Sequence, residues 1–358
     1  MRIVRYYPRA MVGDGGMTSA VRNWSQAMGR CGAEAVIAYD TGVTPPDDAY
    51  VEWVQVRHAG RRGLKFPLGL EEVLEGADVL VLHSGWTLRN VRAAAAARKL
   101  GVPYVLEPRG AYDPHIVSRK RWLKKVWWAA WERRLVHKAR AIHVFFEPER
   151  EHLAALGYRG EIIVASNGRE AHEGRSWDGG SGGYVLWLGR FDPEHKGLDL
   201  LLDAMRLLPA SERPKLRLHG PDWRARKETV RQWIRDKDLD AWVTVGDAVH
   251  GDQKRELLTR ATGFVYPSRW DACPNSVLES VALGVPTLVT PYPLGCFFTD
   301  KGGALLAESD AEGLAKGLVT LRGGDVAGVG RTGAQVVRDE LGWDTVARLW
   351  LDQAEGLL

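Results

Sequence analysis

The chain has 358 residues, more than the roughly 250 to 300 at which a single hydrophobic core usually stops growing, so two domains are expected. Its composition, 45% hydrophobic and 26% charged residues, is ordinary for a globular protein, and no apolar run approaches the roughly 20 residues of a membrane span. Three scattered cysteines argue against a disulfide scaffold or a cysteine metal cluster. The net charge of +4 does not indicate a nucleic-acid partner.

The first residues, MRIVRYYPRAMVGDGG, contain no apolar block that ends in a small-residue cleavage site, so no secretory signal is predicted. We therefore expect a cytoplasmic protein by default. Peripheral contact with the inner membrane surface stays open because of a basic segment described below.

In chain order, short apolar runs alternate with helical patterns through the first half. Strands are expected at residues 1–7, 33–39, 77–83, 102–108, 139–146 and 161–168, and helices at 18–30 and 91–100. Strand, helix and strand at this spacing indicate βαβ units and a parallel sheet. Residues 1–169 are therefore predicted to form a Rossmann-like domain.

A second series follows residues 170–183, EAHEGRSWDGGSGG, whose five glycines and low apolar content predict a flexible linker. Strands are expected at 184–190, 215–220, 242–246, 263–268 and 285–290, and helices at 198–208, at 227–237, before Arg260 and after Pro274. Residues 184–342 are thus predicted to form a second doubly wound α/β domain. Residues 343–358 are expected to form a helix that can pack on either domain and is assigned to the first.

Ligands of doubly wound sheets bind at the carboxyl ends of the strands, so the loops after the predicted strands are candidate sites. Residues 189–197, GRFDPEHKG, contain two cations, Arg190 and Lys196. They are either a solvated turn, or an Arg fork and a Lys point charge that neutralise phosphate oxygens.

The stretch SRWDACPNSVLES places two acids, Asp271 and Glu279, eight positions apart around a predicted helix start. Asn275 is predicted as the N-cap of a helix that ends near Gly284, so backbone N–H groups at Asn275 and Ser276 form a potential anion site. Glu279 then lies just past the first turn, where an acid also simply compensates the helix dipole.

A single bound ligand would explain both the two cations, Arg190 and Lys196, and the two acids, Asp271 and Glu279. If the helix start and the two cations hold a diphosphate, the nearby carboxylates are suited to accept hydrogen bonds from vicinal hydroxyl groups. A diphosphate flanked by a ribose and a hexose is a nucleotide sugar.

Several stretches resemble the retaining glycosyltransferases of family four, which have the GT-B fold of two Rossmann-like domains facing across a cleft. The matching stretches are GGMTSAV at 15–21, PRGAYDP at 108–114, SNG at 166–168, GRFDPEHKG at 189–197 and PSRWDACPNSVLESVALGVP at 267–286. The last is the most specific, because in this family two acids enclose seven residues and a small-residue helix and Gly-x-Pro follow.

The resemblance implies a nucleotide-sugar donor bound mostly by the second domain, and it implies that the first domain, residues 1–169, lies on the acceptor side of the enzyme. Arg190 and Lys196 would bind the diphosphate, Glu279 the ribose hydroxyls and Asp271 the hydroxyls of the transferred sugar. The donor-binding residues implied in addition are Gly15 and Gly16 in the first loop, amides at Asn275 and Ser276, and, for the base, Val249 and His250.

This sequence departs from the family pattern at two places. Asp271 stands where the family commonly has Glu, which puts the identity of the sugar in doubt. Many relatives have a His after the strand at 102–108 that reaches the sugar, and here Arg109 occupies that neighbourhood. His83 and His115 are further candidates for this contact, or are ordinary strand-end and loop residues.

The resemblance also implies transfer with retention, in which the leaving diphosphate helps to deprotonate the acceptor and fixed cations stabilise the departing charge. No catalytic metal and no cofactor are expected. The expected partners are a UDP or GDP sugar and a sugar, lipid-linked, natural-product or protein acceptor; no nucleic acid is expected.

Two other enzyme classes would require different sequence motifs. A NAD-type Rossmann oxidoreductase would use Gly13 to Gly15, but the third glycine of GxGxxG falls at Thr18, and Asp40 is the one acid that closes the next strand. A metal-dependent GT-A transferase would need Asp-x-Asp at a strand end. Such spacings occur between Asp236 and Asp240, in a charged stretch interpreted as solvated surface.

Residues 118–138, SRKRWLKKVWWAAWERRLVHK, combine eight Lys or Arg with four Trp. Such a segment can lie on anionic lipid, which allows a basic membrane-surface protein without catalysis or an enzyme that docks on a membrane. The spacing of Trp127, Ala130, Trp131 and Leu135 equally predicts a buried stripe with a solvated basic face.

Overall fold

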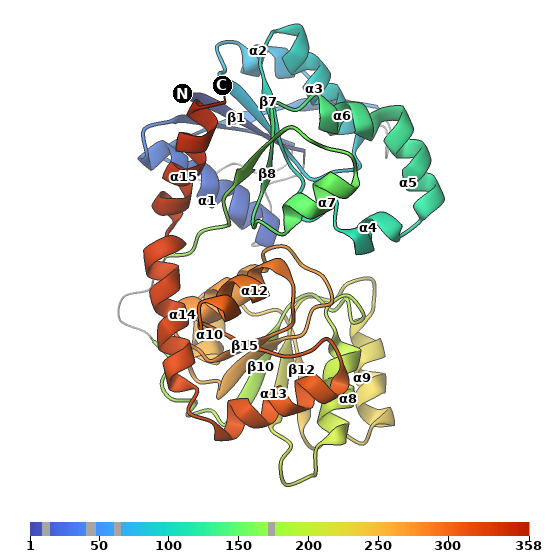
Figure 1. Ribbon diagram of the computed structural model, residues 1–358, viewed down its shortest axis with the longest axis vertical. Helices are drawn as coiled ribbons and strands as arrows, with labels where there is room; N and C mark the ends of the chain where they lie inside the picture. Colours follow the sequence, from blue (N-terminus) through green and yellow to red (C-terminus); the bar gives the residue numbers. More distant parts are fainter. Residues whose placement is uncertain (9–14, 41–47, 61–65, 171–175, 358) are drawn as a thin grey trace. The chain divides into compact units, whose positions relative to one another are not determined.

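The computed structural model describes residues 1–8, 15–40, 48–60, 66–170 and 176–357. They fall into two compact units: unit 1 comprises Met1–Gly168 and Trp343–Leu358, and unit 2 comprises Arg169–Gly342. Each unit is built on a parallel β-sheet flanked by helices (Figure 1). The predicted fold class of two doubly wound α/β domains is therefore confirmed.

Within its described residues, unit 1 has a seven-stranded sheet in the order β3-β2-β1-β6-β7-β8-β9, in which every neighbouring pair is parallel. The order reverses between β1 and β6, which is the switch point of this sheet. The strands are β1 (Arg2–Tyr7), β2 (Glu34–Tyr39), β3 (Val51–Gln55), β6 (Val79–His83), β7 (Tyr104–Glu107), β8 (Ala141–Val144) and β9 (Glu161–Val164). A separate antiparallel pair consists of β4 (Arg57–Ala59) and β5 (Phe66–Leu68).

The helices of unit 1 connect these strands and cover the sheet. They are α1 (Gly16–Arg30), α2 (Leu70–Leu74), α3 (Leu88–Lys99), α4 (Pro114–Ser118), α5 (Arg121–Trp127), the π-helix η1 (Trp128–Glu132), α6 (Arg133–His137), α7 (Glu149–Ala155) and α15 (Trp343–Glu355). The start of α3 is fixed by Thr87, whose hydroxyl accepts a hydrogen bond from the Arg89 N–H.

The C-terminal helix α15 belongs to unit 1 and lies beside α1 (Figure 1). The Trp343 ring meets the Trp24 ring edge-on, with centroids 5.9 Å apart, and Asp344 pairs with Arg30 at 2.6 Å. Gly168 permits this close packing, because a Cβ there would lie 2.7 Å from the Trp343 Cα.

The described residues of unit 2 have a six-stranded sheet in the order β12-β11-β10-β13-β14-β15, with its switch point between β10 and β13. The strands are β10 (Tyr184–Leu188), β11 (Lys215–His219), β12 (Val243–Gly246), β13 (Gly263–Tyr266), β14 (Thr287–Val289) and β15 (Leu305–Leu306). The helices are α8 (Leu198–Leu207), α9 (Lys227–Asp236), α10 (Gly251–Thr259), α11 (Asn275–Ala282), α12 (Pro293–Asp300), α13 (Ala311–Gly323) and α14 (Ala327–Glu340).

The predicted linker at 170–183 is only partly described, since residues 171–175 lie outside the described residues. The stretch that follows is bound to unit 2: the Trp177 N–H donates to the Leu283 carbonyl, and the Asp178 and Gly182 N–H groups donate to the carbonyls of Thr259 and Arg260. Residues 177–182 thus form part of unit 2 and are not a free connection.

No helix in the described part of the chain is long and apolar enough to cross a membrane.

Candidate functional site

The predicted donor-binding residues of unit 2 gather at the switch point of its sheet. Arg190 and Lys196 follow β10, and Asp271 follows β13, the neighbouring strand on the other side of the reversal. Carboxyl ends of parallel strands meet at one edge of the sheet, so residues far apart in the sequence form one site here.

A glycine allows the two loops to touch. Gly197 has φ +64°, and a Cβ at this position would lie 1.9 Å from the Pro267 carbonyl oxygen, so no other residue fits without displacing the backbone. The Arg269 N–H donates to the His195 carbonyl at 3.0 Å. The loop after β10 is therefore fixed against the loop after β13.

Lys196 and Asp271 form an ion pair at the centre of this site. The Lys196 ammonium contacts Asp271 Oδ2, and the Tyr266 hydroxyl donates to the same oxygen at 3.0 Å. The two charged side chains are 9% and 20% exposed. Burial raises the pKa of the Asp271 carboxyl, but the charges of Lys196 and His195 and the two hydrogen bonds outweigh burial and hold it below its usual value. Asp271 is therefore ionised at neutral pH.

His195 anchors the loop beneath this pair. Its Nε2 lies 2.7 Å from the Trp270 carbonyl oxygen, its Nδ1 lies 3.3 Å from Asp192 Oδ2, and its ring stacks on the Trp270 ring at 4.6 Å. Asp192, His195, Trp270 and Tyr266 were not predicted from the sequence as site residues. The spacing of Asp192 and His195 within GRFDPEHKG could have indicated their contact, since both belong to the tight turn that ends at Gly197.

Arg190 is the more accessible of the two predicted phosphate ligands. Its side chain is 43% exposed, its guanidinium lies over the Trp223 ring at 4.7 Å, and it is 3.8 Å from Asp192 Oδ2. The loop after β10 thus presents one half-exposed cation and one nearly buried cation.

Helix α11 begins at Asn275 and ends in the predicted way. The residue before it, Pro274, is the N-cap, so the prediction of Asn275 as N-cap is wrong by one position: Pro274 has the extended backbone of a cap, and Asn275 is already helical. Asn275 and Ser276 therefore provide the first N–H groups of the helix. Gly284, with φ +75°, ends the helix as predicted.

Glu279 faces two cations of unit 2. Its carboxylate accepts from Arg169 Nη1 at 3.3 Å and from Lys254 Nζ at 2.9 Å, and its side chain is 10% exposed. Sequence reasoning missed both cations: Arg169 follows the SNG stretch, and Lys254 lies on α10, just after the predicted base-binding residues. Of the two predicted base-binding residues, Val249 is half-buried, and His250, the residue before α10, is exposed.

In unit 1, Gly15 precedes α1 and Gly16 is its first residue. A Cβ at Gly15 would meet nothing closer than 3.8 Å, and the backbone φ of −58° suits any residue. Neither sterics nor backbone conformation within the described residues requires glycine here. Gly13 and Asp14, on which the oxidoreductase alternative depended, lie outside the described residues.

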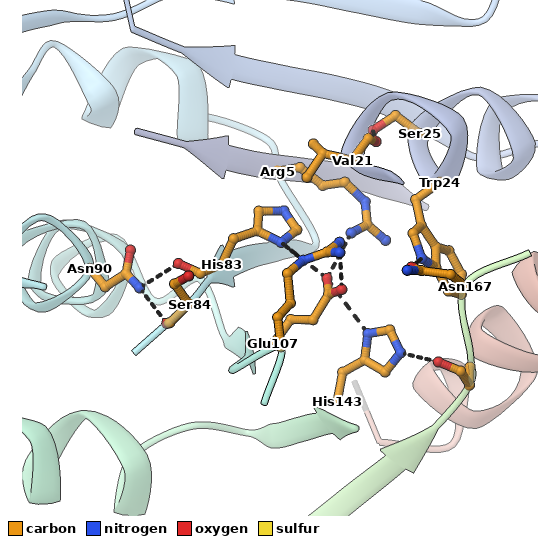
Figure 2. A network of polar contacts seen from close by, with 12 residues as sticks. Arg5, Val21, Trp24, Ser25, His83, Ser84, Asn90, Glu107, His143 and Asn167 are labelled. Carbon is orange, nitrogen blue, oxygen red and sulfur yellow. Dashed lines mark hydrogen bonds and ion pairs between the residues drawn. The ribbon is translucent and has the colours of Figure 1, made fainter. Parts of the chain in front are cut away.

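A buried cluster centred on Glu107 occupies the carboxyl ends of four neighbouring strands of unit 1 (Figure 2). Glu107, on β7, is 0% exposed. Its Oε1 lies 2.6 Å from Arg109 Nη2, and its Oε2 lies 3.2 Å from Arg5 Nη1, 3.1 Å from His83 Nδ1 and 3.7 Å from His143 Nδ1. Burial raises the pKa of Glu107, but the surrounding cations and imidazoles lower it well below its ordinary value.

The structure separates the three residues predicted on the acceptor or sugar side. Arg109 is 6% exposed and pairs with Glu107, which lies beside His83. His115 lies on α4 with its side chain 61% exposed, and its Nδ1 is 3.0 Å from Asp113 Oδ1. His83 and Arg109 thus share one cluster, and His115 is not a member of it.

A cavity of about 570 Å³ opens at the switch point of the unit 1 sheet. Pockets of roughly 300–1,000 Å³ are typical of small-molecule sites. Its walls come from the ends of β1, β2 and β6 and the starts of α1 and α3, namely Tyr7, Pro8, Met17, Asp40, His83, Ser84, Gly85, Trp86, Thr87 and Arg89. Of the predicted site residues, His83 is the one that lines it.

Among the described residues, no group of three or more His, Cys, Asp or Glu is arranged to hold a metal ion. The Asp-x-Asp spacings lie at the end of α9, and Asp238 is 91% exposed, as expected for solvated surface.

Two protein-family models match the chain. Residues 182–322 match the model described as glycosyl transferases group 1, and residues 15–168 match the glycosyl transferase 4-like domain. Together they cover most of both units. The chain belongs to the group 1 glycosyl transferases. The resemblance deduced from the sequence is thereby confirmed, and the family offers no support for an oxidoreductase or a non-enzymatic membrane protein.

Solved structures of GT-B glycosyltransferases are similar to this group 1 glycosyl transferase over its whole length. Sucrose-phosphate synthase of Thermosynechococcus elongatus is 16% identical, covers 99% of this chain and 98% of its own, and gives a TM-score of 0.77. The HepE protein of Anabaena in complex with UDP and glucose is 15% identical over 100% of both chains, with a TM-score of 0.76. At these identities the likeness establishes the fold.

Among curated proteins, O-antigen chain mannosyltransferase B of Escherichia coli is 30% identical over 115 residues. The matched part is 31% of this chain and spans 30% of the length of that relative.

Proposed function

We propose that this glycosyltransferase moves a sugar from a nucleoside diphosphate sugar, of UDP or GDP, to a hydroxyl group of an acceptor, with retention of the anomeric configuration and without a metal ion or other cofactor. The observation that carries the proposal is the grouping of Arg190, Lys196 and Asp271 beside the start of α11 at the switch point of unit 2. The UDP and glucose named for the similar HepE structure support a uridine diphosphate sugar.

In this proposal, each group of residues in unit 2 binds a different part of the donor. Arg190, Lys196 and the backbone N–H groups at Asn275 and Ser276 bind the two phosphates, so fixed cations act together with a helix N-terminus. Asp271, oriented by Lys196 and Tyr266, accepts hydrogen bonds from the transferred sugar.

The remaining predicted donor residues serve the nucleoside and the entry loop. Glu279 holds the ribose, and the loop at Val249 and His250 contacts the base. Gly15 and Gly16, at the start of α1 in unit 1, are assigned to the donor as well.

Metal independence is supported by an electrostatic argument, and retention by deprotonation of the acceptor on the face that the diphosphate leaves. Negative charge develops on the departing diphosphate in the transition state. Preorganised cations interact more strongly with this charge than with the bound substrate, so they lower the activation barrier. Arg190 and Lys196 supply this stabilisation, and the leaving phosphate oxygen takes the acceptor proton. Incubation with each nucleotide sugar in excess chelator, followed by NMR of the product, tests both points. Loss of activity in chelator contradicts metal independence, and an inverted anomeric centre contradicts retention.

Replacing Glu279 by glutamine is expected to weaken nucleotide binding by roughly 10- to 100-fold, because a hydrogen bond to a charged group contributes about 1.5–3 kcal/mol. Calorimetric titration with UDP and GDP measures the effect. Glu312→Gln, at an exposed position in the first turn of α13, is the matched control and should bind nucleotide like the unmodified protein. Equal affinity of Glu279→Gln and the control would remove Glu279 from the donor site.

We further propose that residues 118–138 contact an anionic membrane surface and thereby bring the enzyme to a lipid-linked acceptor. The buried stripe predicted at Trp127, Ala130, Trp131 and Leu135 is wrong, since only Leu135 is buried. A left-handed residue, Lys120, and the π-helix η1 interrupt the helical periodicity.

The same segment exposes large apolar side chains among its cations. Trp122 is 69% exposed, Val126 61%, Leu123 44% and Trp131 40%. Exposed aromatic and aliphatic groups among Lys and Arg residues suit the boundary between lipid headgroups and acyl chains.

Replacement of Trp122 and Val126 together by alanine is expected to lower affinity for anionic vesicles by about tenfold or more, because burial of each side chain is worth about 1.5–3 kcal/mol. Sedimentation with phosphatidylglycerol vesicles measures this, and neutral phosphatidylcholine vesicles provide the charge control. Leu207→Ala, which removes a side chain 58% exposed on α8, should leave binding unchanged. Equal sedimentation with both lipids, or of both variants, contradicts the proposal.

A further inference from the structure

The loop after β11 runs beside the loop after β10 that carries Arg190. The Gly189 N–H donates to the His219 carbonyl at 3.1 Å, and the residue after Arg190 donates its N–H to the second loop at 3.0 Å. A Cβ at Gly220 would lie 1.6 Å from the Gly189 carbonyl oxygen, so glycine is required where the two loops meet. The backbone on both sides of Arg190 is therefore fixed against the loop after β11.

Trp223 belongs to this second loop, whose backbone is strained. The two residues that follow it, Arg224 and Ala225, both have a φ of 58°, which residues other than glycine rarely adopt. The Arg226 N–H donates to the Trp223 carbonyl at 3.2 Å, and the first N–H of α9 donates to Asp222 Oδ1 at 3.0 Å. Strain of this kind is concentrated at functional sites and ligand clamps, which makes the position of Trp223 a candidate for a functional role.

The Trp223 side chain contacts guanidinium groups and is not part of the buried core of unit 2. It is 38% exposed. The guanidinium carbon of Arg190 lies over its ring, 4.7 Å from the centroid, and that of Arg224 lies 5.2 Å from the same centroid. The ring thus joins the strained loop to the cation that is predicted to bind phosphate.

The Trp223 ring holds Arg190 without using its hydrogen-bond donors. No acceptor among the described residues takes a hydrogen bond from the Arg190 guanidinium, and Asp192 Oδ2, at 3.8 Å, is beyond hydrogen-bond distance. A carboxylate partner would compete with phosphate for the N–H groups of an arginine, whereas an aromatic face attracts the cation and occupies none of them. Arg190 is therefore oriented and still able to bind phosphate oxygens through its N–H groups.

This support matters because Arg190 is half-exposed. Lys196, the other predicted phosphate ligand, is 9% exposed and is already fixed by Asp271, whereas the Arg190 side chain is 43% exposed. A long side chain that is free in solution loses its rotamer freedom when a ligand binds, which lowers the affinity by roughly threefold to tenfold for each such side chain. A ring that orders Arg190 beforehand removes this cost.

We propose that Trp223 is the positioning residue for Arg190, and that its ring holds the guanidinium in the orientation that receives the donor diphosphate. The proposal rests on the proposed donor role of Arg190 and adds to it a residue that the family resemblance did not imply. Trp223 acts only through Arg190 and makes no contact with the reacting atoms.

Calorimetric titration with UDP and with GDP tests the role of the ring. Trp223→Ala should bind the preferred nucleotide about threefold to tenfold more weakly than the unmodified protein. Trp223→Phe keeps an aromatic face and should retain most of the affinity. Equal affinity of Trp223→Ala and the unmodified protein overturns the proposal, and so does a loss in Trp223→Phe as large as that in Trp223→Ala.

A second pair of this kind in unit 2 provides the matched control. The Arg213 guanidinium carbon lies 4.9 Å from the Trp242 ring centroid, and the two residues precede β11 and β12, at the opposite ends of the strands from the donor loops. Trp242→Ala should therefore bind nucleotide like the unmodified protein. A loss equal to that of Trp223→Ala would show a general effect of removing a surface tryptophan and overturns the proposal.

A double-mutant cycle distinguishes positioning from a merely structural role of Trp223. Arg190→Ala alone should weaken nucleotide binding by about 10- to 100-fold, because it removes charged hydrogen bonds to phosphate. In the Arg190→Ala protein, Trp223→Ala should cause no further loss, since the side chain that it positions is absent. A second loss of threefold to tenfold in that protein would show that Trp223 acts independently of Arg190, which overturns the proposal.

The same titrations separate this inference from the function on which it rests. If the unmodified protein binds neither nucleotide, or if Arg190→Ala binds as well as the unmodified protein, the donor role of Arg190 fails and the role of Trp223 fails with it. If Arg190→Ala is weakened and Trp223→Ala is not, the donor role of Arg190 stands and only the role of Trp223 fails.

Discussion

Replacement of Lys196 by alanine is expected to lower the turnover of donor sugar by about 10² to 10³, the usual effect of removing one preorganised donor from a site of developing negative charge. Lys196 is nearly buried beside Asp271 and Tyr266, so it is already oriented and partly desolvated before the donor binds. A loss in kcat with little change in nucleotide affinity identifies stabilisation of the transition state. Single-turnover transfer from the nucleotide sugar, combined with UDP titration, provides both measurements.

The ion pair itself complicates this substitution, because removal of Lys196 leaves Asp271 unpaired and only 20% exposed. Loss of one partner of a buried pair commonly costs about 3–5 kcal/mol of stability. The double variant Lys196→Ala with Asp271→Asn removes both charges and is expected to recover much of that stability without recovering turnover. Full turnover in a folded Lys196→Ala protein would exclude Lys196 from the chemistry.

The sequence was sufficient to predict the two sheets and the neighbouring loops that carry three of the predicted donor residues. Apolar runs that alternate with helical patterns specify parallel strands, and residues after such strands meet at one edge of the sheet, so Arg190, Lys196 and Asp271 were correctly expected in neighbouring loops. The ion pair between Lys196 and Asp271 was not predicted, because it depends on the close approach that Gly197 permits. The roles of these residues stay predictions.

The Glu107 cluster was beyond sequence reasoning for a physical reason. Arg5, His83, Glu107 and His143 lie on four strands that are neighbours only in the order β1-β6-β7-β8. Within their separate apolar runs each is one polar residue at or near a strand end, and strand order is not encoded locally. Sequence reasoning could select His83 as a strand-end histidine but gave no indication that its partner is a buried carboxylate.

The stripe predicted within residues 118–138 was wrong for the opposite reason, because it rested on a local pattern alone. Regular helical spacing would have placed Trp127, Trp131 and Leu135 on one face. The π-helix η1 changes the spacing, and the buried Glu132 carboxylate accepts from Trp127 Nε1 at 2.9 Å and from the Trp86 N–H at 2.8 Å. The hydrogen bonds of the buried Glu132, and not regular helical spacing, therefore accompany the face of the segment that points inward.

Replacement of Glu107 by glutamine is expected to destabilise unit 1 by about 3–5 kcal/mol at pH 7, because the nearly isosteric amide leaves two buried guanidinium groups without their counter-charge. Arg5 is 1% exposed and Arg109 6%, and burial has already lowered the pKa of Arg5 to about 10. Two units unfold separately in many proteins, so the measurement must report on unit 1 alone. Hydrogen exchange at β6 and β7 provides this readout.

The pH dependence of this stability has a defined sign. Glu107 has a lowered pKa in the folded chain, so its stabilisation is complete above the unfolded carboxyl pKa of about 4.3 and is lost as the pH falls through the folded value. His83 titrates at about 4 when folded and at about 6.5 when unfolded, so the unfolded chain takes up a proton first and stability also falls as the pH drops from about 6.5 to 4.

Two variants separate the contributions of Glu107 and His83 to the pH dependence of stability. His83→Asn should lose the decline between about pH 6.5 and 4 and keep the decline below about 4.3. Glu107→Gln should begin from lower protection at pH 7 and lose the decline below about 4.3. Protection at β6 and β7 that is equal in Glu107→Gln and the unmodified protein at pH 7 would show that the buried carboxylate does not hold the cluster together.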